Sequence, residues 1–426
     1  MTVSDKRVMV FVIAVAVSLN FCVILGYTLL QSEEDRSLGE CREDEHLLYA
    51  RKVKNFPSYF HQQMLNLSHW KTFPLLVDLS LSNNAVYTRV LHWMTKMNPQ
   101  YFLPASRSSG SVDLHLYIGC VVKNTAKKKG KLQSLLVRDS STSPNNLTVN
   151  VKNDTALLCR KMNASSSVMQ CPQTFIVTPA FNELDRFLSV TESENQDSLW
   201  IYKPIAEFGG HGVALFNNSK KAAEHAEAHI DTTTKLIIDS GEGGVLQRVV
   251  SPPMLVNGRR FSLRVYVAAT QSDSLRVFFG QSYFRIFMAD KPENEESVEQ
   301  NRHFVTNNIG SMSYTKVYDF LMYLENMSKL KQFWEETLPK MQRGFGEFFS
   351  HVSFLPPKGF TAFEIFGCDV LLDINLIPYL LECNPCSGVF AEAKSHATLF
   401  EELLYISLYQ HETNEIPDDI HHWVLI

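Results

Sequence analysis

The sequence predicts an α+β fold whose second half consists mostly of antiparallel strands. Short apolar runs rich in β-branched and aromatic residues recur from Cys171 onward, for example at 199–204 and 261–269. Segments with helical spacing, such as 181–190, separate some of these runs. Composition agrees, because 45% hydrophobic and 20% charged residues are typical of a globular protein and exclude wholesale disorder.

Charge and cysteine content exclude two further classes. The chain carries 45 acidic and 40 basic residues, a formal net charge of −5, so no basic excess indicates a nucleic-acid-binding protein. Eight cysteines in 426 residues are too few for a small scaffold held together by disulfides.

Residues 8–30 predict a membrane anchor. The segment lacks charged residues, and about 20 apolar residues suffice to cross a bilayer as a helix. A cleaved signal peptide is the alternative. Lys6 and Arg7 precede the segment and an acidic stretch follows it, which places the body of the chain on the luminal or extracellular side. The sequence therefore predicts a single-pass membrane glycoprotein, and six glycosylation sequons support this: Asn66, Asn146, Asn153, Asn163, Asn217 and Asn326.

Several elements are expected along the chain. Residues 114–122 are predicted to form a buried strand, and 123–169 a polar loop. Past Cys171, strands are expected at 174–179, 199–204, 208–216, 235–240, 244–250, 261–269 and 275–286, with helices at 181–190, 220–229, 318–349 and 399–410. Residues 360–384 are expected to form two strands around a turn.

Two strands near the end of the chain carry a candidate metal site. Glu382 and Asn384 are two residues apart, so they share one face of a strand. Folding the chain about a hairpin loop at 373–378 pairs Asp369 with Glu382. Two carboxylates and an amide oxygen are suitable Mg²⁺ ligands. Acidic residues kept at a strand edge for solubility are the alternative, but the neighbouring residues are apolar.

A lysine and a glycine loop predict an anion site. Lys203 ends a strand, and Gly209, Gly210 and Gly212 follow it. Glycines let backbone N–H groups approach a polyphosphate, and a lysine adds a positive charge. The spacing differs from that of a Walker loop, so this signal is weak alone.

Three arginines lie on apolar strands: Arg260, Arg264 and Arg276. Arg260 and Arg264 are an even number of residues apart and so face the same side. Arginines among apolar strand residues usually bind an anion such as phosphate or carboxylate, although structural ion pairs are the alternative.

Taken together, these segments resemble the tubulin tyrosine ligase-like family, which has an ATP-grasp fold. The matching segments occur in the family's order at 200–213, 245–267, 304–310 and 363–388, within about 171–410. The resemblance implies an ATP-dependent ligase that joins an amino acid to a protein or peptide carboxylate through an acyl-phosphate. ATP, a free amino acid and, by family analogy only, tubulin are the implied substrates, with no role for nucleic acid. If tubulin is the acceptor, the body of the chain is expected in the cytosol instead.

The resemblance also assigns roles by position. Lys203 and the loop glycines Gly209, Gly210 and Gly212 would hold ATP phosphates, and Gln247 and Arg248 would lie beside the adenine. Thr306 and Asn307 would line the same cleft. Arg264 and Arg276 would face the phosphates and the acyl-phosphate. Asp369, Glu382 and Asn384 would bind Mg²⁺, with two ions expected.

The implied domain organisation has five parts. A short tail (1–7) and the anchor (8–30) precede an N-terminal domain (31–170) that includes the polar loop 123–169. The ATP-grasp region (171–410) is divided at about residue 245 into a central and a C-terminal part, and residues 411–426 form a tail.

Departures from the family keep a second function open. Many members have Lys-Phe-Asp-(Ile/Leu)-Arg where this chain has residues 260–264, so Ser262 replaces an aspartate. The N-terminal half is unfamiliar, and a further phosphate-contacting lysine of the family is not identified. A non-catalytic membrane-anchored luminal binding protein on the same fold is therefore the alternative.

The cysteines leave two questions open. Cys383 and Cys386 form a nominal C-x-x-C, but the predicted metal site passes through it, which argues against a redox motif. Cys159 and Cys171 either form a disulfide or remain free.

Overall fold

The computed structural model describes the second half of the chain most fully. The described residues from 152 onward are 152–162, 168–193, 198–205, 210, 212–230, 243–271, 274–289, 292–293, 313–315, 317–352, 362–384 and 395–426. Before residue 152 they are 63–64, 66, 74–78, 100–104, 114–116 and 134–135. The chain divides into two compact units, 1–56 and 57–426, and every described residue belongs to the second.

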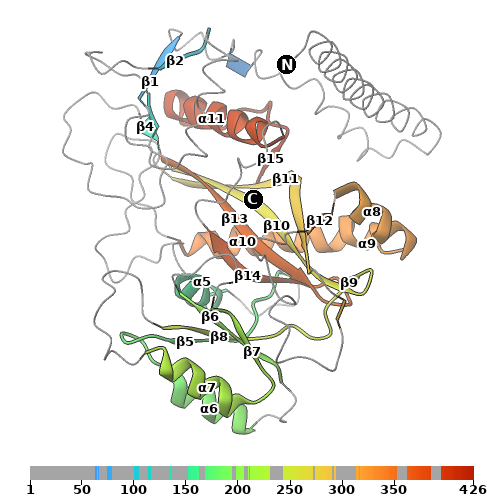
Figure 1. The fold of residues 1–426 in the computed structure, drawn as a ribbon. Helices are drawn as coiled ribbons and strands as arrows, with labels where there is room; N and C mark the ends of the chain where they lie inside the picture. Colours follow the sequence, from blue (N-terminus) through green and yellow to red (C-terminus); the bar gives the residue numbers. More distant parts are fainter. Residues whose placement is uncertain are drawn as a thin grey trace, which may run out of the picture. The chain divides into compact units, whose positions relative to one another are not determined.

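The largest sheet contains seven of the described strands and is antiparallel throughout (Figure 1). Its main path is β12-β11-β10-β13-β14, with β15 on β11 and β9 on β10. The strands are β9 (Leu255–Val256), β10 (Arg259–Gln271), β11 (Leu275–Met288), β12 (Ser313–Thr315), β13 (Ala362–Leu372), β14 (Pro378–Asn384) and β15 (Trp423–Leu425). The antiparallel pairing of these segments agrees with the predicted α+β class.

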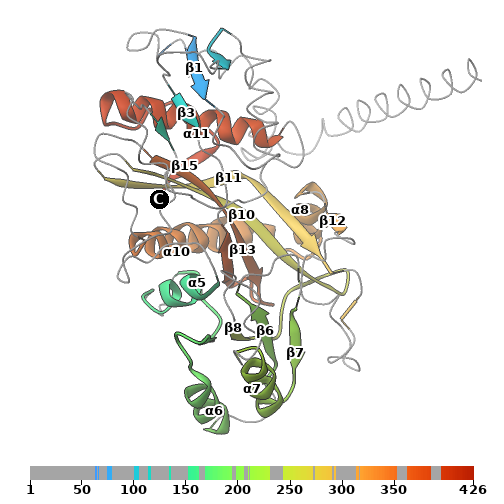
Figure 2. The ribbon, with the colours of Figure 1, turned by 60° about the vertical axis from the view of Figure 1, so that its left-hand side comes forward.

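Helices cover both faces of this sheet (Figure 2). Helix α10 (Leu338–Ser350) packs on one face, where Phe345 contacts Phe279 and Phe349 contacts Phe366. Helix α11 (Ser395–Thr413) packs on the other face, where Phe400 contacts Phe363. Alternate residues of a strand point to opposite faces, so the apolar β10 run supplies both layers. Helices α8 (Val317–Asn326) and α9 (Leu330–Gln332) and a π-helical turn (Phe333–Thr337) lead into α10.

A smaller antiparallel sheet forms the central part of the described chain. Its order is β5-β8-β6-β7, from β5 (Thr174–Val177), β6 (Trp200–Pro204), β7 (Ala214–Phe216) and β8 (Gly244–Arg248). One face buries Phe175, Trp200 and Tyr202 against helices α6 (Leu184–Ser193) and α7 (Ser219–Ala228). The other face turns toward α5 (Lys152–Cys159) and, beyond it, the large sheet.

A four-stranded parallel sheet lies in the described N-terminal segments. Its order is β2-β1-β3-β4, from β1 (Leu75–Asp78), β2 (Phe102–Pro104), β3 (Leu114–Leu116) and β4 (Ser134–Leu135). The predicted strand at 114–122 is present over its first three residues, and 117–122 lie outside the described residues.

Two predicted irregular segments contain regular structure instead. Residues 152–159, expected within the polar loop 123–169, form helix α5 because Thr155, Ala156 and Leu158 are buried against the neighbouring strands. The expected tail at 411–426 contains β15, whose Trp423 is 1% exposed. The remaining domain boundaries stay predictions.

The predicted anchor at 8–30 lies outside the described residues. Within the part of the chain that the structure describes, no helix is both long enough and apolar enough to cross a membrane.

Two disulfides occur among the described cysteines. Cys159 is bonded to Cys171, which confirms the first of the two alternatives for this pair. Cys383 is bonded to Cys368 on the neighbouring strand, so its partner is not Cys386 of the nominal C-x-x-C.

Candidate functional site

The predicted carboxylate pair is present on the hairpin of β13 and β14. Asp369 lies directly opposite Glu382, which confirms the pairing expected from folding about the hairpin loop. Asn384 shares the face of Glu382, because its Nδ2 donates to Glu382 Oε1 at 2.9 Å. The three predicted metal-binding side chains are therefore neighbours on adjacent strands.

Arg264 extends this cluster onto β10. It lies opposite Asp369 in the register, and its Nε and Nη2 donate to the two carboxylate oxygens at 2.5 and 2.8 Å. The Arg264 guanidinium also stacks over the Phe287 ring, 5.2 Å from its centroid. Burial raises the pKa of Asp369, although the charge of Arg264 acts to lower it. Both side chains of the pair are largely withdrawn from water.

Two lysines supply positive charge to the same cluster. Burial acts to raise the pKa of Glu382, but the charges of Lys203 and Lys152 outweigh it, and the pKa is lowered. Lys203 is 6% exposed, and burial lowers its pKa while Glu382 and Asp369 oppose that change. Lys152, on α5, donates to the carbonyl of Ile205 at 3.5 Å. Sequence reasoning missed Lys152 because it lay in a segment with the composition of a loop.

A pocket lies between the small and the large sheets, next to the carboxylates. It is an open concavity whose volume of about 600 Å³ includes space open to solvent. Its polar lining is Lys203, Gln247, Arg248, Arg260 and Ser262. Its apolar lining is Ile201, Val249, Val250, Phe261, Phe287, Met288, Ala289, Leu371 and Leu381. Apolar walls with a few polar groups at defined positions can hold a flat base and a charged tail.

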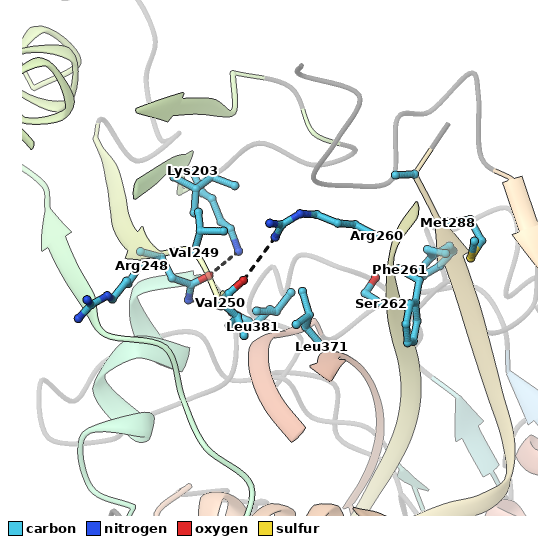
Figure 3. A pocket seen from close by; sticks show the side chains of 14 residues that line it. Lys203, Arg248, Val249, Val250, Arg260, Phe261, Ser262, Met288, Leu371 and Leu381 are labelled. Carbon is cyan, nitrogen blue, oxygen red and sulfur yellow. Dashed lines mark hydrogen bonds between the residues drawn. The ribbon is translucent and has the colours of Figure 1, made fainter. Parts of the chain in front are cut away.

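Lys203 and Gln247 are bound to each other within this pocket. Lys203 Nζ donates to Gln247 Oε1 at 2.7 Å (Figure 3). Gln247 Nε2 in turn donates to Thr174 Oγ1 at 3.1 Å. The two residues lie on β6 and β8, which pair directly. Arg248, also predicted beside the adenine, lines the pocket and donates from Nη2 to Ser198 Oγ at 2.8 Å.

The glycine loop follows Lys203 as predicted. Gly210 and Gly212 have φ angles of 76° and 68°, a region that residues with a side chain rarely adopt. A Cβ at Gly212 would also lie 2.7 Å from Pro204 Cγ. The turn after the lysine therefore requires glycine. Gly209 lies outside the described residues, as do Thr306 and Asn307.

Arg276 is not brought to the cluster. It pairs with Thr270, six positions along β10 from Arg264, which is roughly 20 Å in an extended strand. Its Nη2 donates to the carbonyl of Asn414 at 3.5 Å. The predicted role of Arg276 beside the phosphates is therefore corrected. Arg285 lies directly opposite Arg264 instead, and sequence reasoning did not select it.

Position 262 lies at the edge of the pocket, where Arg260 also points inward (Figure 3). Arg260 Nη2 forms an ion pair with Glu293 Oε1 at 2.5 Å, and its Nη1 donates to the carbonyl of Val250 at 3.5 Å. Ser262 supplies no charge here, so the carboxylate nearest to Arg260 in this part of the described chain comes from Glu293.

The residues present fit a divalent cation and a nucleoside triphosphate. The oxygen donors at this position are the carboxylates of Asp369 and Glu382 and the amide of Asn384. Among the described residues, no group of three or more His, Cys, Asp or Glu side chains is placed to hold a metal ion. Each carboxylate oxygen accepts more than one bond, so the contacts with Arg264 and Asn384 leave acceptor capacity on both acids. Such oxygen ligands suit Mg²⁺ shared with phosphates, and two lysines lie beside them.

Comparison with known proteins gives a family match. The model of the tubulin-tyrosine ligase family matches residues 131–419, about two thirds of the chain. This range includes every described residue of the cluster and of the pocket.

Three curated relatives are similar over part of the chain. Tubulin polyglutamylase TTLL7 of Homo sapiens is 24% identical over 50% of this chain and 25% of its own length. Probable tubulin polyglutamylase ttll-9 of Caenorhabditis elegans is 25% identical over 49% of this chain and 50% of its own length. Tubulin glycylase 3D of Tetrahymena thermophila is 24% identical over 63% of this chain and 26% of its own length. The chain thus spans between a quarter and a half of the length of these relatives.

These findings correct the predicted localisation. The relatives are named as a tubulin polyglutamylase and a tubulin glycylase, enzymes that act on tubulin. The expectation of a single-pass membrane protein with a luminal or extracellular body is therefore withdrawn, together with the membrane as a partner.

Proposed function

This chain belongs to the tubulin-tyrosine ligase family, and on that basis we propose that it is an ATP-dependent ligase that adds an amino acid to a carboxylate of a protein or peptide. The observation that carries the proposal is one row of charged groups across the large sheet. Arg285, Arg264, Asp369 and Glu382 follow one another on β11, β10, β13 and β14. This row adjoins the pocket that contains Lys203 and Gln247.

The pocket would hold ATP with its phosphates directed toward the row. Gln247, Arg248 and the apolar side chains of Val249 and Val250 would contact the base. Lys203, Lys152 and the backbone of the glycine loop would contact the phosphates. Asp369, Glu382 and Asn384 would bind the Mg²⁺ ions, which neutralise phosphate charge when bound.

The proposed reaction has two steps. An acceptor carboxylate oxygen attacks the γ-phosphorus of ATP, and ADP leaves. The amine of the incoming amino acid then attacks the acyl carbon, an amide bond forms, phosphate leaves and the amine loses a proton. Both steps depend on positioning and on neutralising negative charge, which Arg264 and Arg285 would supply without a nucleophilic side chain.

Tubulin is the first acceptor to test. The relatives are named as polyglutamylases and a glycylase of tubulin, so glutamate and glycine are the first amino acids to test, with tyrosine as the third. The acceptor and the amino acid remain proposals because the chain spans a quarter to half of those relatives.

One observation favours a second function. Ser262 lines the pocket, at the position where the resemblance to the family implies an aspartate. If that carboxylate is required for catalysis, the chain is a nucleotide-binding protein that does not ligate.

Incorporation of labelled amino acid separates the two. The full chain is incubated with ATP, Mg²⁺, tubulin and labelled glutamate, glycine or tyrosine, and label in tubulin and released ADP are both measured. The ligase proposal predicts equal amounts of label and ADP, both lost in Glu382→Gln and retained in Glu325→Gln, an exposed glutamate on α8. ATP binding without label or ADP would support the second function, and absence of ATP binding would contradict both.

A further inference from the structure

The disulfide between Cys368 and Cys383 lies immediately beside the carboxylate pair. Cys368 precedes Asp369 on β13 and Cys383 follows Glu382 on β14. The register pairs Cys368 with Cys383 and, one step further along, Asp369 with Glu382. The covalent bond therefore joins the two strands next to the position where their carboxylates meet.

The bond and the carboxylates occupy opposite faces of the sheet. Cys368 and Cys383 are 0% and 2% exposed and belong to the apolar core beneath α10, together with Phe366 and Phe345. Successive residues of a strand point to opposite faces, so Asp369 and Glu382 face the cleft. The disulfide thus acts on the carboxylates only through the backbone of the two strands.

Two features of this hairpin weaken the pairing at the carboxylates. Like charges directly opposite each other on neighbouring strands disfavour pairing, and Asp369 and Glu382 are such a pair. Arg264, bound to Asp369, and the charges of Lys203 and Lys152 near Glu382 offset part of this repulsion. The register is also irregular between Asp369 and Val370, so that Val370 pairs with Leu380 and Leu381 is left over. An irregularity of this kind interrupts the ladder on the hairpin side of the carboxylate pair.

A second contact supports the strand next to the bond. The backbone N–H of Cys383 donates to Thr155 Oγ1 of helix α5 at 3.4 Å. The same helix carries Lys152, whose charge acts on Glu382. The disulfide therefore lies where the strand with two of the proposed metal ligands meets the helix with one of the proposed phosphate-binding lysines.

We propose that the Cys368–Cys383 disulfide is a positioning element of the Mg²⁺ site, which keeps Asp369 and Glu382 opposite each other against their own repulsion and against slippage at the adjacent irregularity. This inference rests on the proposed function, because it concerns the site that would bind Mg²⁺ and ATP. Loss of the bond is expected to weaken Mg²⁺ binding more than it weakens the apolar part of the nucleotide site.

The second disulfide provides a matched control. Cys159 and Cys171 are 12 residues apart and Cys368 and Cys383 are 15 apart, so the loops closed by the two bonds are similar in length and their effects on the unfolded chain are similar. Both pairs contact the same apolar core. Only the second pair adjoins the carboxylates.

ATP binding is measured by calorimetry over a series of free Mg²⁺ concentrations, on the full chain and on two double variants. The double variant Cys368→Ala with Cys383→Ala is expected to raise the Mg²⁺ concentration for half-maximal ATP binding at least fivefold. The control, Cys159→Ala with Cys171→Ala, is expected to change this concentration less than twofold. Equal Mg²⁺ dependence in wild type and the first variant would overturn the positioning role alone. Wild type that binds no ATP with Mg²⁺ would overturn the proposed function and the inference with it.

A second measurement tests the coupling to charge. If the bond opposes carboxylate repulsion, its removal lowers the melting temperature at most half as much in a Glu382→Gln background as in wild type. A purely structural bond would cause the same decrease in both backgrounds, which would contradict the proposal.

If the double alanine variant does not fold, the wild-type chain is treated with a phosphine reductant, and mass spectrometry identifies the opened bond before the Mg²⁺ series is repeated. A rise of at least fivefold in the Mg²⁺ concentration for half-maximal ATP binding would support the proposal, and an unchanged concentration would overturn it.

Discussion

Arg264 on β10 binds both carboxylate oxygens of Asp369 on β13, through Nε at 2.5 Å and Nη2 at 2.8 Å. Both side chains are largely withdrawn from water, at 14% and 7% exposure. A bidentate pair of this kind fixes the orientation of the carboxylate. The carboxylate proposed to bind metal is therefore already oriented by an arginine proposed to face the phosphates.

Removal of Arg264 is expected to destabilise the chain because it leaves Asp369 buried without its counter-charge. Arg264→Met should lower the free energy of unfolding by about 3–5 kcal/mol, because removing one partner of a buried ion pair leaves the other charge buried and uncompensated. Denaturation by urea measures the change. Arg264→Met combined with Asp369→Asn should recover most of the loss, since no orphan charge remains. An equal loss in the single and the double variant would contradict this account.

Arg285 and Arg276 give opposite expectations although both lie on β11. Arg285 is opposite Arg264 in the charged row, whereas Arg276 lies beside Asn414 at the other end of the strand. Arg285→Ala should therefore lower the ligation rate at least 100-fold, a loss typical of removing a group that stabilises developing charge. Arg276→Ala should change the rate less than threefold. Initial rates of ADP release check both variants, and a reversed order would show that the charged row is not the reaction site.

Lys152 and Lys203 are expected to bind nucleotide phosphates. Both charges act on Glu382, and Lys203 is buried in the pocket. Lys152→Ala and Lys203→Ala should each weaken ATP binding at least tenfold, with a smaller effect on adenosine, which has no phosphates. Lys161→Ala, an exposed lysine just past the same helix, is the control. Equal weakening of ATP and adenosine would place these lysines at the base and not at the phosphates.

Two buried glutamates on α11 predict a decrease in stability above neutral pH. Burial raises the pKa of Glu401 to about 8. Burial also raises the pKa of Glu402 to about 7, although its carboxylate accepts backbone N–H groups from His421, His422 and Trp423. The folded chain therefore binds more protons than the unfolded chain, so stability falls as the pH rises from 6.5 to 8.5. Burial lowers the pKa of His422 to about 4, so this histidine contributes only below that window.

Melting temperatures at a series of pH values test this expectation. The wild-type value should fall between pH 6.5 and 8.5, and Glu401→Gln should reduce the slope because the buried charge can no longer form. Glu336→Gln, whose side chain is 56% exposed, should leave the slope unchanged. A wild-type melting temperature that stays constant or rises over this range would contradict the protonation account.

The carboxylate pair was predictable because a hairpin obeys a simple rule. Folding about residues 373–378 gives cross-strand partners whose numbers sum to 751, which pairs Asp369 with Glu382 as observed. The pairs nearest the turn sum to 750 instead, and the extra residue Leu381 restores the predicted register at the carboxylates. The glycine loop was predictable for a related reason, since glycines in succession after a strand indicate backbone angles that other residues avoid.

The arginine opposite Arg264 was not predictable by the same rule. Folding β10 and β11 about residue 273 without interruption would pair Arg264 with Ser282. The register instead changes from Val267 opposite Phe279 to Val265 opposite Phe284, which brings Arg285 to Arg264. Nothing in the apolar pattern of β11 reveals this irregularity. Lys152 was missed because helix α5 is short and is stabilised by contacts with strands distant in the sequence.

The central claim is that Asp369, Glu382 and Asn384 form a Mg²⁺ site that serves ATP in the adjoining pocket. Calorimetric titration of ATP into the full chain, with and without Mg²⁺, tests it most directly. We expect binding in the micromolar range with Mg²⁺, at least tenfold weaker binding without it, and the same weak binding of Glu382→Gln under both conditions. ATP binding that is independent of Mg²⁺, or unchanged by Glu382→Gln, would contradict the claim.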